Sequence, residues 1–197
     1  MAYDLPSQQH LKSRTGYMPR YLLWIEARDP VTGVIAPEGI WSGVGNRSFM
    51  IDGVDRVYSG FGTAFAPDTF RYTSELLVVG QRVQLSGLRP KAVSLIQQTV
   101  LKSAKVALHQ ALHDPLTQNL IGIERKFVGF VDKAPRETPA RGDGGSTITL
   151  SLVSKLREMT EPLALQKSHE AQKLRSGDHF RQYGSIASVV DASWGET

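Results

Sequence analysis

The clearest strand signal in the chain is Thr147-Ile148-Thr149-Leu150-Ser151-Leu152. Apolar and polar residues alternate strictly along it, which is the period of a strand with one buried and one exposed face. Residues 77–85 show a similar alternation, in which Leu77, Val79, Gln81, Val83 and Leu85 share one side and Arg82 and Gln84 lie on the other. The sequence therefore predicts a fold built on half-buried strands.

Turn motifs connect other apolar runs into hairpins. Asp29-Pro30-Val31-Thr32-Gly33 follows the aromatic and apolar run 21–27. Proline presets φ early in such a turn, and glycine supplies a positive φ at its end. Asp52-Gly53 lies inside the apolar run 48–58, where it predicts a second hairpin. Asp114-Pro115-Leu116-Thr117 resembles the first turn, and we interpret this as a weak internal echo of one hairpin type.

Four further segments complete the expected elements. Residues 90–98 predict a short helix, with Pro90 near its first position and an apolar side. Residues 105–113 fit a strand or a helix extended from Val100, and the turn that follows them favours the strand. A second short helix is expected near 168–174. A long strand is predicted to carry on one side Ile121, Ile123, Phe127, Gly129 and Val131.

The composition supports a mainly β fold. The 18 glycines and 10 prolines indicate many turns, which favour short strands over long helices. We expect an antiparallel β-barrel or sandwich with one short helix, long loops and an extended C-terminal segment. The expected organisation is an N-terminal arm (1–20), a β-barrel domain (21–154) and a C-terminal extension (155–197). The arm is expected either to fray or to order against a neighbouring subunit.

Charge and residue usage exclude several classes of protein. The net charge of +4 is lower than a dedicated nucleic-acid-binding protein of this length would carry. The absence of cysteine excludes disulfides and thiolate metal sites. The first 20 residues lack the apolar core of a secretory signal, and no run approaches about 18 apolar residues. We therefore expect neither a secretory signal nor a membrane anchor.

No motif for catalysis, cofactor binding or metal binding is evident, and we predict a non-enzymatic protein without cofactor or metal. His109 and His113 are four residues apart, so on a helix they would share a face and could hold a metal ion. On a strand they would lie roughly 13 Å apart along the chain. We interpret them as solvated or interface histidines. The segment 141–146 is interpreted as a hairpin tip.

The C-terminal extension carries mixed charge and one unusual cluster, Arg175-Ser176-Gly177-Asp178-His179-Phe180. Ser176-Gly177-Asp178 predicts a turn. One interpretation is a local turn closed by a salt bridge between Arg175 and Asp178. The other is a docking element in which Arg175, Asp178 and Phe180 contact the next protein of an assembly.

Three blocks of residues, in this order along the chain, resemble a known family. The first runs through Trp41-Ser42-Gly43-Val44-Gly45, Phe49-Met50-Ile51-Asp52-Gly53 and Tyr58-Ser59-Gly60; the second is 127–135 and the third is 175–180. Together they are similar to tail-tip structural proteins, of the distal-tail or baseplate-hub kind, of long-tailed bacteriophages and prophages. Some hub proteins of this group hold a cysteine-ligated iron–sulfur cluster, which this cysteine-free chain lacks, so a distal-tail adaptor is as plausible as a hub.

The resemblance implies an architecture and a set of partners. Relatives resemble tail-tube β-barrels and form homo-oligomeric rings, threefold or sixfold, at the tail tip of the virion. The ring joins the tail-tube protein to the central fibre or host-recognition protein. Genome DNA would pass through its lumen without specific binding. The chain would be made in the cytoplasm of the bacterial host.

An assembly role directs attention to the predicted loops 36–48, 59–72 and 134–146. Four aromatic residues in the first two loops are expected to anchor contacts between subunits: Trp41, Phe61, Phe65 and Phe70. Large aromatic side chains often dominate the energy of an interface. For Trp41 and Phe61, a place in the core of the chain is a nearly equal alternative.

Two other functions were weighed against the structural role. A tail-associated cell-wall hydrolase would need a pocket that brings together carboxylates such as Asp68, Glu75 and Asp178, and no spacing supports one. A carbohydrate-binding β module would need an exposed aromatic platform. Sizing chromatography distinguishes them, because rings indicate a tail protein, a glycan-binding monomer indicates the module, and peptidoglycan turnover indicates the hydrolase.

Overall fold

The computed structural model describes residues 4–70, 77–137, 146–160, 169–180 and 182–183. The chain divides into two compact units, Met1–Met159 and Thr160–Thr197. The first holds every described strand, and its last strand ends at Ser154, where the predicted barrel domain ends.

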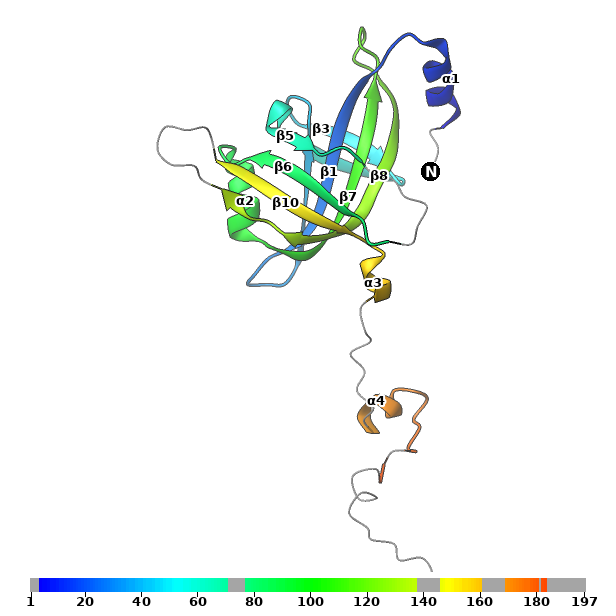
Figure 1. Cartoon of the computed structure of the whole chain (residues 1–197), viewed down its shortest axis with the longest axis vertical. Coiled ribbons are helices and arrows are strands. Elements are labelled where there is room, and N and C mark those ends of the chain that lie inside the picture. The colour runs from blue at the N-terminus through cyan, green and yellow to red at the C-terminus, as the bar shows by residue number, and fades with distance from the viewer. Residues whose placement is uncertain (1–3, 71–76, 138–145, 161–168, 181, 184–197) are drawn as a thin grey trace, which may run out of the picture. The chain divides into compact units, whose positions relative to one another are not determined.

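The first unit is built on one large, curved mixed sheet (Figure 1). Its strands run in the order β3-β4-β2-β1-β7-β8-β10-β6-β5, with β9 paired to β10. The bounds are β1 (Met18–Arg28), β2 (Ile35–Trp41), β3 (Arg47–Ile51), β4 (Val54–Gly60), β5 (Phe65–Pro67), β6 (Gly80–Ser86), β7 (Val100–His113), β8 (Leu120–Lys133), β9 (Arg136–Glu137) and β10 (Thr147–Ser154). This confirms the mainly β fold class.

Two details of the predicted barrel are corrected. The β2–β4 pair is parallel, although the sheet was expected to be antiparallel throughout. The sheet is also not a closed barrel, because its ladder ends at β3 and β5. A groove of about 250 Å³ separates residues 19–21 of β1 from β5. Pro19 and Pro67, which lack an amide N–H to donate to a ladder, line opposite sides of this groove.

The concave side of the sheet encloses the main hydrophobic core, named the inner core here. Alternate residues of the strands point into it, and every buried member is hydrophobic. Helix α2 (Pro90–Gln98), which has the predicted bounds, adds Ala92 and Leu95. The other buried members are Leu23, Ile25, Ala27, Ile40, Phe61, Phe65, Val83, Leu85, Leu101, Ala104, Val106, Leu108, Val131, Ile148, Leu150 and Leu152.

The opposite face of β1 and β7 supports a second core, named the outer core here. Because side chains alternate across a strand, Leu22 faces this core while its neighbour Leu23 faces the inner one. The β3–β4 hairpin covers this face with buried hydrophobic side chains. Its Asp52-Gly53 turn has positive φ at both residues, as the Asp-Gly pair predicted. The buried members are Leu22, Trp41, Phe49, Ile51, Tyr58 and Ala111.

Strand β8 changes faces along its length. A register shift opposite Leu108 and His109 places one extra residue in β8, so its side chains exchange sides there. Ile123 therefore packs on the outer core, whereas Phe127 and Val131 pack on the inner core. The prediction that these residues share one side is wrong, because a bulge leaves no periodic signal in the sequence.

The N-terminal residues are anchored on β8. Helix α1 (Leu5–Ser13), which the sequence did not predict, begins after Asp4, whose side chain accepts the amide N–H of Ser7. The Ser7 hydroxyl donates to the carbonyl of Ile121, 3.2 Å away, beside a second register shift of β8. A Cβ at Gly122 would overlap this hydroxyl, so glycine is required for the contact.

The two Asp-Pro turns adopt the same structure. The Asp29 carboxylate accepts the N–H groups of Val31 and Thr32, and the Asp114 carboxylate accepts those of Leu116 and Thr117. These hydrogen bonds lower the pKa of both carboxyl groups. Since β1 and β7 are antiparallel, the turns lie at opposite ends of that pair. The predicted echo of one hairpin type is confirmed.

Some of the remaining predicted elements are confirmed and others are corrected. Residues 105–113 lie in a strand, and the segment near 168–174 contains helix α4 (His169–Lys173). The loop predicted over 36–48 is wrong for its first part, which is strand β2. The loop predicted over 59–72 contains a 3-10 turn (Gly62–Ala64) and β5. A further short helix, α3 (Arg157–Thr160), follows β10, and 138–145 lie outside the described residues.

Candidate assembly interface

The block Trp41-Ser42-Gly43-Val44-Gly45, which carries part of the family resemblance, is a junction of main-chain contacts. Ser42 is paired in both directions with Tyr21 of β1: its N–H donates to the Tyr21 carbonyl, and its hydroxyl accepts the Tyr21 N–H at 2.8 Å. The Trp41 indole donates to the Gly45 carbonyl at 2.8 Å. A Cβ at Gly43 would overlap the Trp41 ring. These residues therefore fix the path of the chain between β2 and β3.

The four loop aromatics predicted as subunit anchors are part of the chain's own core. Trp41 lies in the outer core, only 6% exposed, and Phe61 and Phe65 lie in the inner core. Phe70 packs against the inner core and contacts the Tyr21 ring at a centroid distance of 6.0 Å. The expectation of subunit anchors is corrected for Phe65 and Phe70, and the alternative of a core position holds for Trp41 and Phe61, because a curved sheet needs large side chains to fill it.

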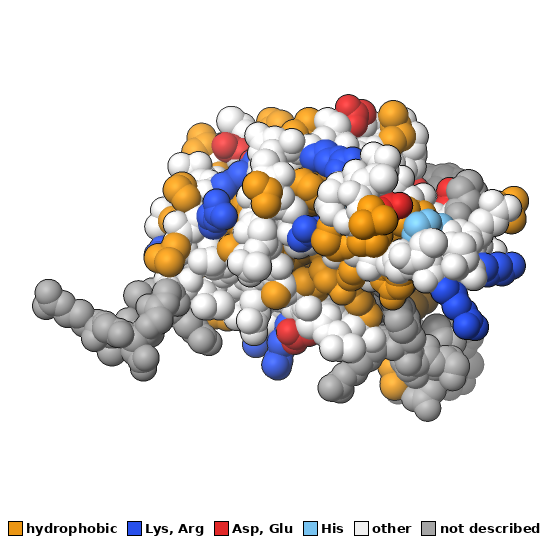
Figure 2. Space-filling view, turned by 90° about the horizontal axis from the view of Figure 1, so that it is seen from above, with side chains coloured by type: hydrophobic (Ala, Val, Ile, Leu, Met, Phe, Trp, Pro, Cys, Tyr) orange, Lys and Arg blue, Asp and Glu red, His pale blue; other side chains and the backbone are white. Residues whose placement is uncertain are grey.

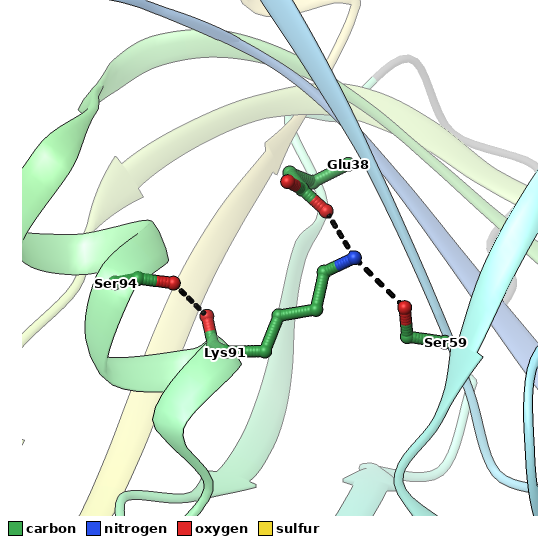
Figure 3. Close-up of polar contacts among 4 residues, drawn as sticks. All are labelled: Glu38, Ser59, Lys91 and Ser94. Carbon is green, nitrogen blue, oxygen red and sulfur yellow. Dashed lines mark hydrogen bonds and ion pairs between the residues drawn. The ribbon is translucent and has the colours of Figure 1, made fainter.

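A polar contact ties α2 to two strands of the sheet (Figure 3). The Lys91 ammonium lies 2.7 Å from a carboxylate oxygen of Glu38 on β2 and donates to the Ser59 hydroxyl on β4, also at 2.7 Å. The Ser94 hydroxyl donates to the Lys91 carbonyl within the helix. Lys91 and Glu38 are both partly exposed, so this pair orients the helix more than it stabilises the fold.

The exposed face of the β3–β4 hairpin carries two apolar side chains that the sequence did not single out, beside Ser48 and Asp55. Met50 and Val57 point away from the outer core and are 65% and 60% exposed. Strand β3 is also one end of the ladder, so its outer backbone groups have no strand partner among the described residues. The unbroken apolar run Phe49-Met50-Ile51 was the available signal, because a strand buried on one face only would alternate.

Figure 2 shows another face of the molecule, seen from above. Hydrophobic side chains gather near the middle of this face, Lys and Arg side chains are scattered around them, and acidic side chains are few. The described residues include no cluster of His, Cys, Asp or Glu arranged to hold a metal ion. Among the described helices, none has both the length and the hydropathy needed to cross a membrane.

His109 and His113 are buried under the β3–β4 hairpin, which corrects their interpretation as solvated or interface residues. Their exposed fractions are 3% and 2%. Burial, together with the nearby Arg56, lowers the pKa of His109 to about 4. Burial and the charges of Arg47 and Arg20 lower the pKa of His113. Both side chains are therefore neutral at physiological pH.

The second unit contains the Arg175–Phe180 cluster. Ser176 and Gly177 have positive φ, which confirms the predicted turn. The Asp178 carboxylate accepts the Phe180 N–H at 2.9 Å and the Gln172 side-chain amide at 2.8 Å, and these bonds lower its pKa. The described part of the chain shows no salt bridge between Arg175 and Asp178. Phe180 is 86% exposed, so the docking role stays a prediction for this ring.

The three carboxylates named for a hydrolase fall in different parts of the chain. Asp68 lies in the first unit and Asp178 in the second, and Glu75 lies outside the described residues.

Comparisons with known proteins give a structural likeness only. No protein-family model matches the chain, and no curated protein matches it. The fold is similar to that of one chain in a solved structure described as "Virion of native gene transfer agent (GTA) particle". The TM-score is 0.52 and the sequence identity is 12%. The match covers 84% of this chain and 50% of that chain, so this chain spans about half the length of its structural neighbour.

Proposed function

We propose that this chain is a structural, non-enzymatic subunit of a phage-like virion. The observation that carries the proposal is a mainly β sheet that ends in two strands, β3 and β5, and whose fold is similar to that of a chain in a virion particle. Unpaired strand edges are an aggregation hazard in a free monomer. Neighbouring subunits in a closed assembly give such edges a partner.

The finer proposal places the subunit at the tail tip, as a distal-tail or hub-adaptor protein. It forms a ring that joins the tail tube to the central fibre or host-recognition protein, and DNA crosses its lumen without specific binding. The three blocks of family resemblance support this position. The exposed hairpin face supports a contact between subunits, because Met50 and Val57 expose apolar area beside β3, which ends the ladder among the described residues.

The experiment begins with particles purified from cells that encode the chain. Quantitative mass spectrometry is expected to find the chain in the particles, in several copies per particle. Deleting its gene is expected to give particles with incomplete tail tips, and a plasmid copy is expected to restore them. Particles that lack the chain, or intact and fully active tails after its deletion, would refute the structural role.

Variants of the plasmid copy test the contact surface. Met50→Asp and Val57→Asp place a charge on the exposed hairpin face without entering the core, so both chains are expected to fold but to be incorporated poorly. Leu88→Asp is the matched control, because Leu88 is an exposed apolar residue outside the hairpin. Equal incorporation of all three variants would show that the hairpin face is not the contact between subunits.

A further inference from the structure

We propose that the β3–β4 hairpin is an acid-releasable cover, held over the outer face of β1 and β7 by the neutral forms of His109 and His113. Release would expose the outer core while the inner core stays folded. The proposal does not depend on the virion role, because it concerns contacts within one chain.

The hairpin is held mainly by its side chains. Its ladder to the rest of the sheet consists of two residue pairs, Ile40 with Ser59 and Trp41 with Gly60. Phe49 is the central contact: its ring centroid lies 5.4 Å from that of Trp41 and 6.3 Å from that of His113. A histidine that is protonated beside these rings carries a charge that needs water or another partner. The closed hairpin keeps water away from it.

Arginine side chains from two neighbouring strands, β3 and β1, lie near His113. Nη1 of Arg47 on β3 lies 3.5 Å from Nε2 of His113, where it approaches a lone pair only if that nitrogen carries no proton. Arg20 on β1 is a second cation beside the ring. No acidic group contributes to the electrostatics of His113 among the described residues. Protonation would therefore set positive charges against each other inside the outer core.

His109 has a more mixed environment that is positive on balance. Arg56 on β4 and Arg125 on β8 oppose its protonation, and Asp52 in the hairpin turn favours it. Glu26 on β1 and Lys105 on β7 line the same small pocket and are opposite each other in the β1–β7 register. The Nδ1 atom of His109 is buried without a hydrogen-bond partner in the described structure. Opening the hairpin gives this atom access to water.

The inner core does not share this sensitivity, because the buried histidine side chains of the described residues, His109 and His113, both lie on the side of the hairpin. Acid is therefore expected to open the hairpin before it unfolds the sheet. Two alanines provide matched reporters: Ala111 on β7 is fully buried in the outer core, and Ala27 on β1 is fully buried in the inner core. The chain has no cysteine, so a single introduced thiol is labelled without background.

The test measures thiol labelling of full-length Ala111→Cys and Ala27→Cys at about pH 7 and about pH 4.5 with 4,4′-dithiodipyridine, which reacts in acid. Each rate is divided by the rate for the same variant unfolded in denaturant at the same pH. A pKa difference of one unit between the closed and open states raises the open population by about tenfold in total, once the pH lies below both values. The normalised Ala111→Cys rate is expected to rise at least about tenfold on acidification, with little change for Ala27→Cys.

A second set of variants ties the effect to the histidines. In Ala111→Cys chains that also carry His109→Leu and His113→Leu, the acid-induced rise is expected to disappear. If that chain does not fold, His109→Leu alone is expected to reduce the rise. No rise in Ala111→Cys, an equal rise in both reporters, or a rise that persists without the histidines would overturn the proposal.

Discussion

The inner and outer cores are built on the two faces of the same strands, yet they differ in chemistry. The inner core is lined by seven strands and a helix, and none of its buried members is ionisable. The outer core is covered by one hairpin and combines tilted and edge-to-face aromatic contacts with two buried histidines. Strand β1 serves both, through Leu23 on one side and Leu22 on the other.

This difference distinguishes the core that stabilises the sheet at any pH from the core whose stability can respond to pH. A core that excludes every ionisable group has a stability that depends little on pH. A core that contains neutral histidines loses stability in acid, because the unfolded or open chain binds protons that the closed form excludes. The hairpin that carries the exposed Met50 and Val57 is paired with the rest of the sheet by only two residue pairs.

The largest predicted effect is a cavity in the inner core. Leu108 is fully buried, so Leu108→Ala is expected to lower the free energy of unfolding by about 3 to 5 kcal/mol. Urea denaturation followed by circular dichroism measures it. Leu116→Ala is the control, because Leu116 is exposed at a hairpin tip and its truncation is expected to change the free energy by less than about 0.5 kcal/mol. A small loss for Leu108→Ala would contradict the description of the inner core.

The second effect is a loss of stability in acid that belongs to the outer core. His109 has a folded-state pKa of about 4, below its ordinary 6.5, so its contribution is fully present above about pH 6.5 and lost as the pH falls to about 4. The loss for this one group is expected to reach at most about 3 kcal/mol. His109→Leu is expected to flatten this part of the curve of unfolding free energy against pH. An unchanged curve would show that His109 is not the group responsible.

The smallest effect concerns the contact between α2 and the sheet. Lys91→Met removes the ion pair with Glu38 and the hydrogen bond to Ser59 while it keeps most of the side chain. Because the pair is partly exposed, the free energy of unfolding is expected to fall by less than about 1 kcal/mol. Glu38→Gln removes the charge of the other partner and is expected to lower the free energy of unfolding by a similar amount. A loss as large as that of Leu108→Ala would contradict the modest role of this pair.

Sequence periodicity predicted the strands that contain one clear alternation or one strong turn. Strand β10, helix α2 and the Asp52-Gly53 hairpin all lie where the sequence indicated them, because each depends on local patterns. The bulge in β8 and the parallel contact between β2 and β4 depend on distant partners, so no local pattern marks them.

The candidate interface was harder to predict than the fold. Aromatic residues in glycine-rich segments looked like surface anchors, yet Phe61 and Phe65 fill the inner core of a curved sheet. Burial of His109 and His113 also depends on a hairpin that comes from elsewhere in the chain. A sequence shows which residues are large and apolar, but the face on which they end depends on what the tertiary fold places over them.

Cryo-electron microscopy of the particles tests the structural proposal most directly. Several copies of the curved sheet are expected to form a ring around the tail axis at the tail tip, with the β3–β4 hairpin of each copy in contact with a neighbour. A map that places the chain as a single isolated copy, or that resolves a complete tail tip without it, would contradict the proposal.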